Sequence, residues 1–228
     1  MIFHNLDYLL PYKLPIKEIE LGDRPVSLKN STIFTTGTTL CGIRTDNFCI
    51  IGTDQQATLY NKGILNVKKA YKIADNFIVT GAGSSYACES AAGYLKALYY
   101  LYEEELELKK DITPLLEYFR QEVSKSGGIE GILLIATKSV NQEKTNYHLY
   151  LVDGMGSSSE LPLAGVGSGG DLAQGVLKEG YTEKLTMQEG LALVKKSIKV
   201  SKSVDLYSGG KSHIYILEAD KTMEVIDL

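Results

Sequence analysis

The residues with the clearest chemical potential lie in the run Thr36-Gly37-Thr38-Thr39-Leu40-Cys41-Gly42-Ile43, where a glycine precedes two threonines and an apolar segment. A cut between Gly37 and Thr38 would leave Thr38 with a hydroxyl and a free α-amine, which is a nucleophile with its own general base. Glycine suits self-cleavage because it has no Cβ and lets the backbone bend toward the hydroxyl. On its own, however, the run is more typical of a turn before a strand.

Three other positions could support such a nucleophile. Asp54 ends the second strand of an expected hairpin that begins at Thr39, so its carboxylate can return close to Thr38. The segment Val67-Lys68-Lys69-Ala70 leads into the third strand, and a lysine ammonium here beside Asp54 would favour the deprotonated Thr38 hydroxyl. Gly83 opens a long helix, and its N–H is a candidate donor to an oxyanion.

Ser168, Asp205 and Ser208 adjoin or closely precede glycines at expected element boundaries. In this position they could relay protons at the nucleophile. Each of them, taken singly, is more often a cap or turn residue. Asp54, taken singly, is more often an acidic turn residue, and Lys68 and Lys69 are more often solvated lysines. The chemistry of all these residues therefore depends on whether the fold brings them together.

Composition excludes several classes of function. The net charge of −4 and the isoelectric point near 5.5 give no electrostatic footprint for nucleic acid. No apolar run approaches the roughly 18 residues of a membrane span, and the N-terminus lacks the pattern of a secretory signal. Three cysteines are too few for a disulfide framework, so a reducing cytosol is expected, with Cys41 and Cys49 as small core residues. The three histidines form no metal motif, and we expect no metal or cofactor.

Hydrophobic periodicity divides the chain into a leader, residues 1–37, and one structured domain, residues 38–228. The expected strands are Leu40–Thr45, Phe48–Thr53, Ala70–Ile73, Phe77–Ala82, Gly131–Thr137, Tyr147–Asp153, Leu161–Ser168, Ser212–Ala219 and Thr222–Ile226. The expected helices run from about Ser85 to Leu106, from Thr113 as N-cap to Gly127, to about Glu179, and onward from a capping box of Thr186 and Glu189.

This order of strands, two helices, strands, two helices and strands predicts an α+β fold. Two antiparallel sheets packed together, with a helix pair outside each, satisfy the order. We therefore predict a four-layer αββα sandwich.

The joint spacing of these motifs resembles the proteasome β-subunit family and, more broadly, the N-terminal nucleophile hydrolases. The resemblance covers nearly everything from Thr38 to Leu228. The segments that carry it are Thr36–Ile43, Gly52–Thr58, Val67–Lys69, Thr80–Gly83, Val166–Gly170 and Asp205–Gly210. Six motifs in the right order make the resemblance specific, although each motif alone is not.

The resemblance implies a threonine endopeptidase made as a zymogen, in which autocatalytic cleavage between Gly37 and Thr38 removes the propeptide, residues 1–37. The implied catalytic residues are Thr38 as nucleophile, Lys69 tuning it, Asp54 holding Lys69, Gly83 binding the oxyanion, and Ser168, Asp205 and Ser208 supporting the amine. The implied partners are other β subunits in a seven-membered ring, α subunits, a regulatory ATPase and unfolded polypeptide substrates. The implied location is the cytoplasm, and also the nucleus if the source is eukaryotic.

Gln56 departs from the family pattern, which usually has arginine two residues after the aspartate. With Ala57-Thr58-Leu59 it looks more like the bacterial relative that forms two six-membered rings with a hexameric ATPase. That relative normally has almost no leader, so the 37 residues before the junction favour the seven-membered ring. Gln56 leaves ring size and full activity open.

The resemblance also suggests a side-chain pocket for the residue before the scissile bond, with Tyr71 at its rim. The implied substrate-binding residues are Ala57, Thr58, Val67, Gly81 and Glu89. Gly81 would leave the pocket deep, and Glu89 near its floor would favour a basic residue, which is a trypsin-like preference.

Two alternative functions stay open. A non-catalytic structural β-type ring subunit would keep the fold without the chemistry, and a stand-alone N-terminal nucleophile amidase would use the same nucleophile without α partners. The full set Gly37, Thr38, Asp54 and Lys69 favours an active subunit over the first alternative.

Overall fold

The computed structural model describes residues 37–59, 62–65, 67–141 and 144–227. The expected leader therefore lies outside the described residues, except for Gly37. The described residues form two five-stranded antiparallel sheets and one two-stranded hairpin, together with four α-helices. This confirms the α+β sandwich that the order of elements predicts.

The first sheet contains the strand that follows the expected cleavage point. Its order is β10 (Leu163–Val166), β1 (Leu40–Arg44), β2 (Cys49–Asp54), β11 (Ser212–Leu217) and β12 (Thr222–Asp227), and every pair is antiparallel. Leu40 pairs with Thr53, and Asp54 pairs with Ser212. The start of β1, the end of β2 and the start of β11 therefore meet at one end of the sheet.

The second sheet has the order β5 (Ala70–Ala74), β6 (Phe77–Gly83), β7 (Gly131–Asn141), β8 (Lys144–Val152) and β9 (Ser158–Glu160), again antiparallel. A separate hairpin of β3 (Gln56–Leu59) and β4 (Lys62–Leu65) leaves the end of β2. This hairpin was not predicted, because its short polar strands lack a clear alternation of apolar residues.

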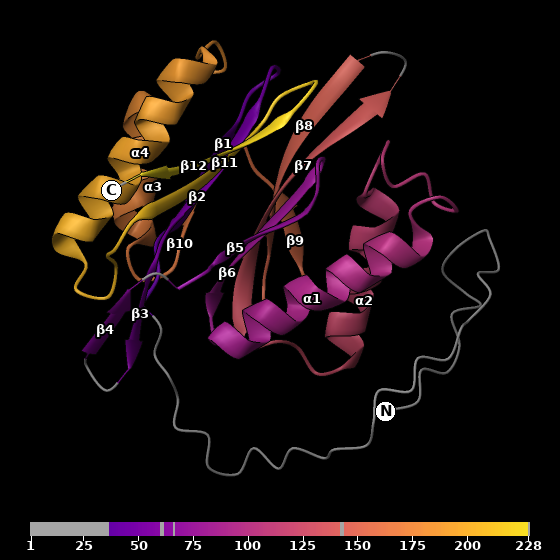
Figure 1. Cartoon of the computed structure of the whole chain (residues 1–228), viewed down its shortest axis with the longest axis horizontal. Coiled ribbons are helices and arrows are strands. Elements are labelled where there is room, and N and C mark those ends of the chain that lie inside the picture. The colour runs from indigo at the N-terminus through magenta and orange to yellow at the C-terminus, as the bar shows by residue number, and fades with distance from the viewer. Residues whose placement is uncertain (1–36, 60–61, 66, 142–143, 228) are drawn as a thin grey trace. The chain divides into compact units, whose positions relative to one another are not determined.

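Helices cover the outer face of each sheet, as Figure 1 shows. The pair α1 (Ser85–Tyr102) and α2 (Thr113–Lys125) packs on the second sheet, and α3 (Gly170–Gly180) and α4 (Met187–Val204) pack on the first. Alternate residues of one strand reach different layers, as expected for a period of two. Ile51 of β2 belongs to the core between the sheets, whereas Ile50 packs toward α3 and α4.

Several predicted boundaries differ from the structure, and two of them lie on either side of the connection between α1 and α2. The long first helix ends at Tyr102 instead of Leu106, and Glu107 shortly afterwards has a left-handed φ of 48°. Thr113 is the first residue of α2 and not its N-cap. The Asp111 carboxylate accepts the Thr113 backbone N–H at 2.9 Å and its hydroxyl at 2.7 Å, so an aspartate earlier in the chain satisfies the donors at this helix start.

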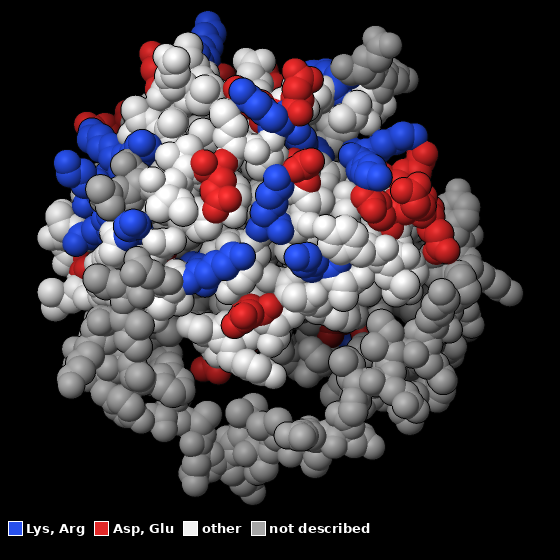
Figure 2. All heavy atoms as spheres, viewed as in Figure 1, with Lys and Arg blue, Asp and Glu red and all other residues white. Residues whose placement is uncertain are grey.

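The buried cysteines agree with the sequence analysis, and two further features concern the apolar and charged residues. Cys41 and Cys49 are buried in the core, and burial raises the pKa of the Cys41 thiol to about 12. Within the described ranges, no helix is long and apolar enough to cross a membrane. On the face in Figure 2, Lys and Arg side chains are interspersed with Asp and Glu.

Candidate active site

The site forms where β1 and β2 run side by side. The Asp54 backbone N–H donates to the Thr39 carbonyl at 3.1 Å, and the Thr39 N–H donates to Asp54 Oδ1 at 3.0 Å. This pairing continues the β1–β2 ladder to the cleavage point, because the next pair inward is Leu40 with Thr53. The strand register therefore places the Asp54 carboxylate within one residue of Thr38.

The Asp54 carboxylate is completely buried and fully hydrogen-bonded. Its Oδ1 accepts from Lys69 Nζ at 2.8 Å as well as from Thr39 N. Its Oδ2 accepts from the backbone N–H groups of Gln56 at 3.0 Å and Gly209 at 2.9 Å. A buried carboxylate is tolerated when a cation and several donors replace its water, and Asp54 has all of them.

Lys69 lies between this carboxylate and the peptide bond expected to be cut. Its side chain is 6% exposed, and Nζ donates to the Gly37 carbonyl at 2.9 Å in addition to Asp54 Oδ1. Burial lowers the pKa of Lys69, and the neighbouring Asp54 charge opposes that shift. The lysine thus acts as an electrostatic bridge between Asp54 and Gly37.

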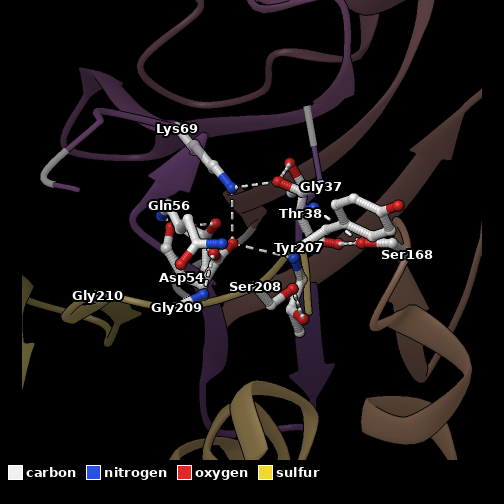
Figure 3. A network of polar contacts seen from close by, with 12 residues as sticks. Gly37, Thr38, Asp54, Gln56, Lys69, Ser168, Tyr207, Ser208, Gly209 and Gly210 are labelled. Atoms are coloured by element: carbon white, nitrogen blue, oxygen red, sulfur yellow. Dashed lines mark hydrogen bonds and ion pairs between the residues drawn. The ribbon is translucent and has the colours of Figure 1, made fainter. Parts of the chain in front are cut away.

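The Thr38 hydroxyl lies beside the same carbonyl, and Figure 3 shows this grouping around Gly37. Thr38 Oγ1 donates to the Gly37 oxygen at 2.8 Å. The Gly37 carbonyl oxygen therefore accepts from both a hydroxyl and Lys69 Nζ. Two donors on one carbonyl oxygen draw electron density from its carbon, and donors in this position are suited to stabilise an oxyanion.

The backbone nitrogen of Thr38 connects to a second polar group. It donates to Ser168 Oγ at 3.1 Å, and Ser168 Oγ donates to Asp205 Oδ2 at 2.6 Å. Ser208 Oγ donates to the same Asp205 oxygen at 2.6 Å and shares a hydrogen bond of 2.8 Å with Thr39 Oγ1. Ser168 follows β10, whereas Asp205 and Ser208 follow α4, so tertiary structure assembles the group.

Gly37 is also constrained by its surroundings. An added Cβ at Gly37 would overlap Cβ, Cα and the carbonyl oxygen of Tyr207. Close approach to the Tyr207 main chain is therefore a reason for glycine in addition to backbone bending. Tyr207 and Thr39 were both missed as site residues in the sequence, although each is next to a residue that was named.

The remaining predicted residues are less closely connected to Thr38. Gly83 ends β6, ahead of α1, and its role at the oxyanion stays a prediction. Among the predicted pocket residues, Ala57 and Val67 are half-buried, Gly81 is buried and Glu89 is exposed on α1, while the side chain of Thr58 lies outside the described residues.

Two observations bear on the pocket. Burial and, after it, the charge of Glu89 raise the pKa of Tyr71 to about 12, so Tyr71 and Glu89 are near each other. The space beside Gly81 is occupied by Cys88 of α1, which an added Cβ at Gly81 would overlap.

No group of three or more potential metal ligands occurs among the residues that the structure describes.

The family model and the relatives that match this chain all carry the name proteasome subunit. A family model described as "Proteasome subunit" matches residues 34–217. "Proteasome subunit beta" of Haloferax volcanii is 29% identical over 206 residues, which are 88% of this chain and 78% of that protein. "Proteasome subunit beta" of Thermoplasma acidophilum is 27% identical over 183 residues, 80% of this chain and 85% of that protein. "Proteasome subunit beta type-7" of Dictyostelium discoideum is 28% identical over 188 residues, 80% and 68% of the two chains.

Replacing Asp54 by asparagine tests the buried ion pair. Asp54→Asn leaves Lys69 without its counter-ion and turns an amide NH₂ toward donors, so we expect the free energy of unfolding to fall by about 3–5 kcal/mol. Because burial already lowers the pKa of Lys69, the unfolded chain binds more protons between the folded and unfolded pKa values, and stability rises with pH there. Without Asp54 the folded pKa falls further, and this rise begins at a lower pH.

Denaturant unfolding measured across a pH series checks both effects. Asp75→Asn is the matched control, because Asp75 pairs with Lys72 at 2.6 Å on the surface and its side chain is 82% exposed. We expect the control to change stability by about 1 kcal/mol at most. Equal stability losses for the two variants would contradict the electrostatic account of Lys69.

Proposed function

The chain belongs to the proteasome subunit family and is a β-type subunit, and from this premise we propose that it is catalytic. In this proposal it is a threonine endopeptidase that frees its nucleophile, Thr38, by cutting its own chain after Gly37. The observation that supports this most directly is the Gly37 carbonyl, which lies between the Thr38 hydroxyl and Lys69 Nζ at 2.8 and 2.9 Å.

Self-cleavage would proceed by an N-to-O acyl shift. Thr38 Oγ attacks the Gly37 carbonyl carbon, the carbonyl becomes an oxyanion held by Lys69, and the C–N bond to Thr38 then breaks. The hydroxyl proton ends on the Thr38 nitrogen, so the shift is an isomerisation from amide to ester. Water then hydrolyses the ester, which releases residues 1–37 as a carboxylic acid and regenerates the hydroxyl of Thr38.

Peptide hydrolysis would use the same residues after the leader has gone. The free amine of Thr38 accepts the hydroxyl proton, directly or through water, as Thr38 attacks the substrate carbonyl. The peptide C–N bond then breaks, the leaving amine takes that proton, and water hydrolyses the ester left on Thr38 to release the acid and regenerate the hydroxyl. Lys69 favours the deprotonated oxygen electrostatically. Ser168, Asp205 and Ser208 orient the amine through the hydrogen bonds that now hold the backbone nitrogen. In this account the leader keeps the amine blocked until assembly.

Proteasome β subunits assemble into core rings with α subunits. For this chain we propose a seven-membered ring, a regulatory ATPase that delivers unfolded polypeptides, and a cytoplasmic location. A non-catalytic ring subunit is the less favoured alternative because all four residues of the set Gly37, Thr38, Asp54 and Lys69 are present and interact. A stand-alone amidase would form a small oligomer without α subunits, which size-exclusion chromatography would reveal.

Thr38→Ala tests the proposed nucleophile. Without the hydroxyl neither the acyl shift nor peptide hydrolysis can begin, so we expect the variant to keep residues 1–37 and to lose peptidase activity. Intact mass spectrometry of the protein assembled with its partner subunits measures the first effect, and hydrolysis of a fluorogenic peptide measures the second. Thr38→Ser is the matched control because serine retains the hydroxyl and should still be cut. Peptide hydrolysis by particles in which every copy of this chain still begins at Met1 would contradict the proposal.

The side-chain pocket gives a separate prediction about specificity. Exposed Glu89 near Tyr71 should attract a basic side chain, so we expect faster hydrolysis of peptides ending in arginine than of those ending in leucine or glutamate. Glu89→Gln should reduce the arginine preference by about 5-fold at most, which is the upper end of the range for an exposed charge pair. Glu105→Gln is the matched control, because Glu105 is equally exposed but lies beyond the end of α1. A clear preference for leucine in the wild type would contradict this pocket.

A further inference from the structure

The loop Asp205–Gly209, here called the relay loop, joins α4 to β11 and contains both Asp205 and Ser208. Little apolar burial holds it in place, because Leu206 is 87% exposed and Tyr207 is 42% exposed. Asp205 nevertheless accepts hydrogen bonds of 2.6 Å from Ser168 and Ser208. The loop must therefore be positioned by polar contacts from outside it.

Three such contacts come from one short segment, residues 54–56. Gly209 N–H donates to Asp54 Oδ2 at 2.9 Å, and Gln55 N–H donates to the Gly209 carbonyl at 3.0 Å. The third contact uses a side chain, since Gln56 Nε2 donates to the Leu206 carbonyl at 3.1 Å. The first two contacts hold the end of the relay loop, and the Gln56 contact holds its middle.

The Gln56 amide also lies directly against Gly209. An added Cβ at Gly209 would overlap Oε1 of Gln56. Gly209 is not among the glycines with a left-handed φ. Because Oε1 is the far end of a flexible side chain, a Cβ at Gly209 would displace the Gln56 amide, and with it the bond to the Leu206 carbonyl. Figure 3 shows Gln56 beside Gly209 and Asp54.

We propose that Gln56 is a positioning residue for the reaction at Thr38. This inference rests on the proposed function. The hydrogen bond from Gln56 to the Leu206 carbonyl fixes the relay loop, so that Asp205 and Ser208 stay in place. Ser168, which donates to Asp205, then stays aligned with the Thr38 nitrogen. Because the Gln56 side chain is a neutral amide, it holds the loop without placing another positive charge near Lys69 and Asp54. Among the described residues, Lys69 is the side-chain cation that forms an ion pair with Asp54.

The test removes the amide donor while keeping the length of the side chain. Gln56→Met and Gln56→Glu both lose the donor, and Gln56→Arg retains one. Gln121→Met and Gln121→Glu are matched controls, because Gln121 Nε2 donates to Glu117 on α2, away from the site. Hydrogen–deuterium exchange of a peptide covering the relay loop reports positioning in the whole chain, with or without catalysis.

We expect exchange in the relay loop to increase by about 2- to 10-fold in Gln56→Met and Gln56→Glu, the range for losing one hydrogen bond. Self-cleavage, followed by intact mass, should slow by a similar factor, whereas Gln56→Arg and both Gln121 variants should stay near the wild type. In Gln56→Met the Asp205 charge is held less closely to the Thr38 amine, so the acid limb of the activity profile should move to lower pH. A purely structural loss would not move this limb.

The inference would be overturned if Gln56→Met and Gln56→Glu both exchanged in the relay loop and cut themselves at the same rates as the wild type. Increased exchange with an unchanged cleavage rate and pH profile would also overturn it, because the loop position would then not matter for the reaction. If the wild-type protein is neither cut nor active, the proposed function fails. In that case increased exchange alone would show that Gln56 positions the loop.

Discussion

The buried pair of Asp54 and Lys69 is the interaction on which the site depends. Two opposite charges taken out of water are stable only when their geometry is good and every remaining donor and acceptor is satisfied. Asp54 meets this condition with four hydrogen bonds, and Lys69 with the bond to Asp54 and one to the Gly37 carbonyl. The same contacts that make the charges tolerable also place a cation on the Gly37 carbonyl, at the bond that we propose is cut.

The sandwich supplies this geometry through strand register. β1 begins where β2 ends, and β11 begins beside them, so residues far apart in the sequence share one end of a sheet. Ser168 lies in the turn before α3, and Asp205 lies in the turn after α4. Both turns are at the same end of the sheet. The position of each site residue is therefore set by where a strand or helix begins or ends, and less by the residues inside that element.

Much of this could be predicted from the sequence. Periodicity predicted nine of the twelve described strands and the four helices, but not β3, β4 or β9. The expected hairpin that begins at Thr39 predicted that Asp54 returns toward Thr38. The predicted N-cap of α2 was wrong because Thr113 is the first helical residue, and the carboxylate that accepts from its N–H belongs to Asp111, two residues earlier. The convergence of Ser168, Ser208 and Thr39 on one network could not be predicted from spacing alone, because it depends on how α4 packs.

The Gln56 contact shows the limit most clearly. Its partner is 150 residues away, and nothing near Gln56 in the sequence indicates a backbone carbonyl as the acceptor. The same residue draws attention as a departure from the family pattern, but its contacts with Leu206 and Gly209 become visible only in the folded structure. Long-range contacts of single side chains are set by tertiary packing, which local patterns do not encode.

The central claim is that the Lys69 ammonium drives release of Thr38, and intact mass spectrometry of newly assembled Lys69→Met protein tests it most directly. Lys68→Met is the control, because Lys68 is exposed and lies over the Tyr71 ring. We predict that Lys69→Met keeps residues 1–37 while Lys68→Met loses them as the wild type does. Loss of the leader from Lys69→Met at the wild-type rate would contradict the account.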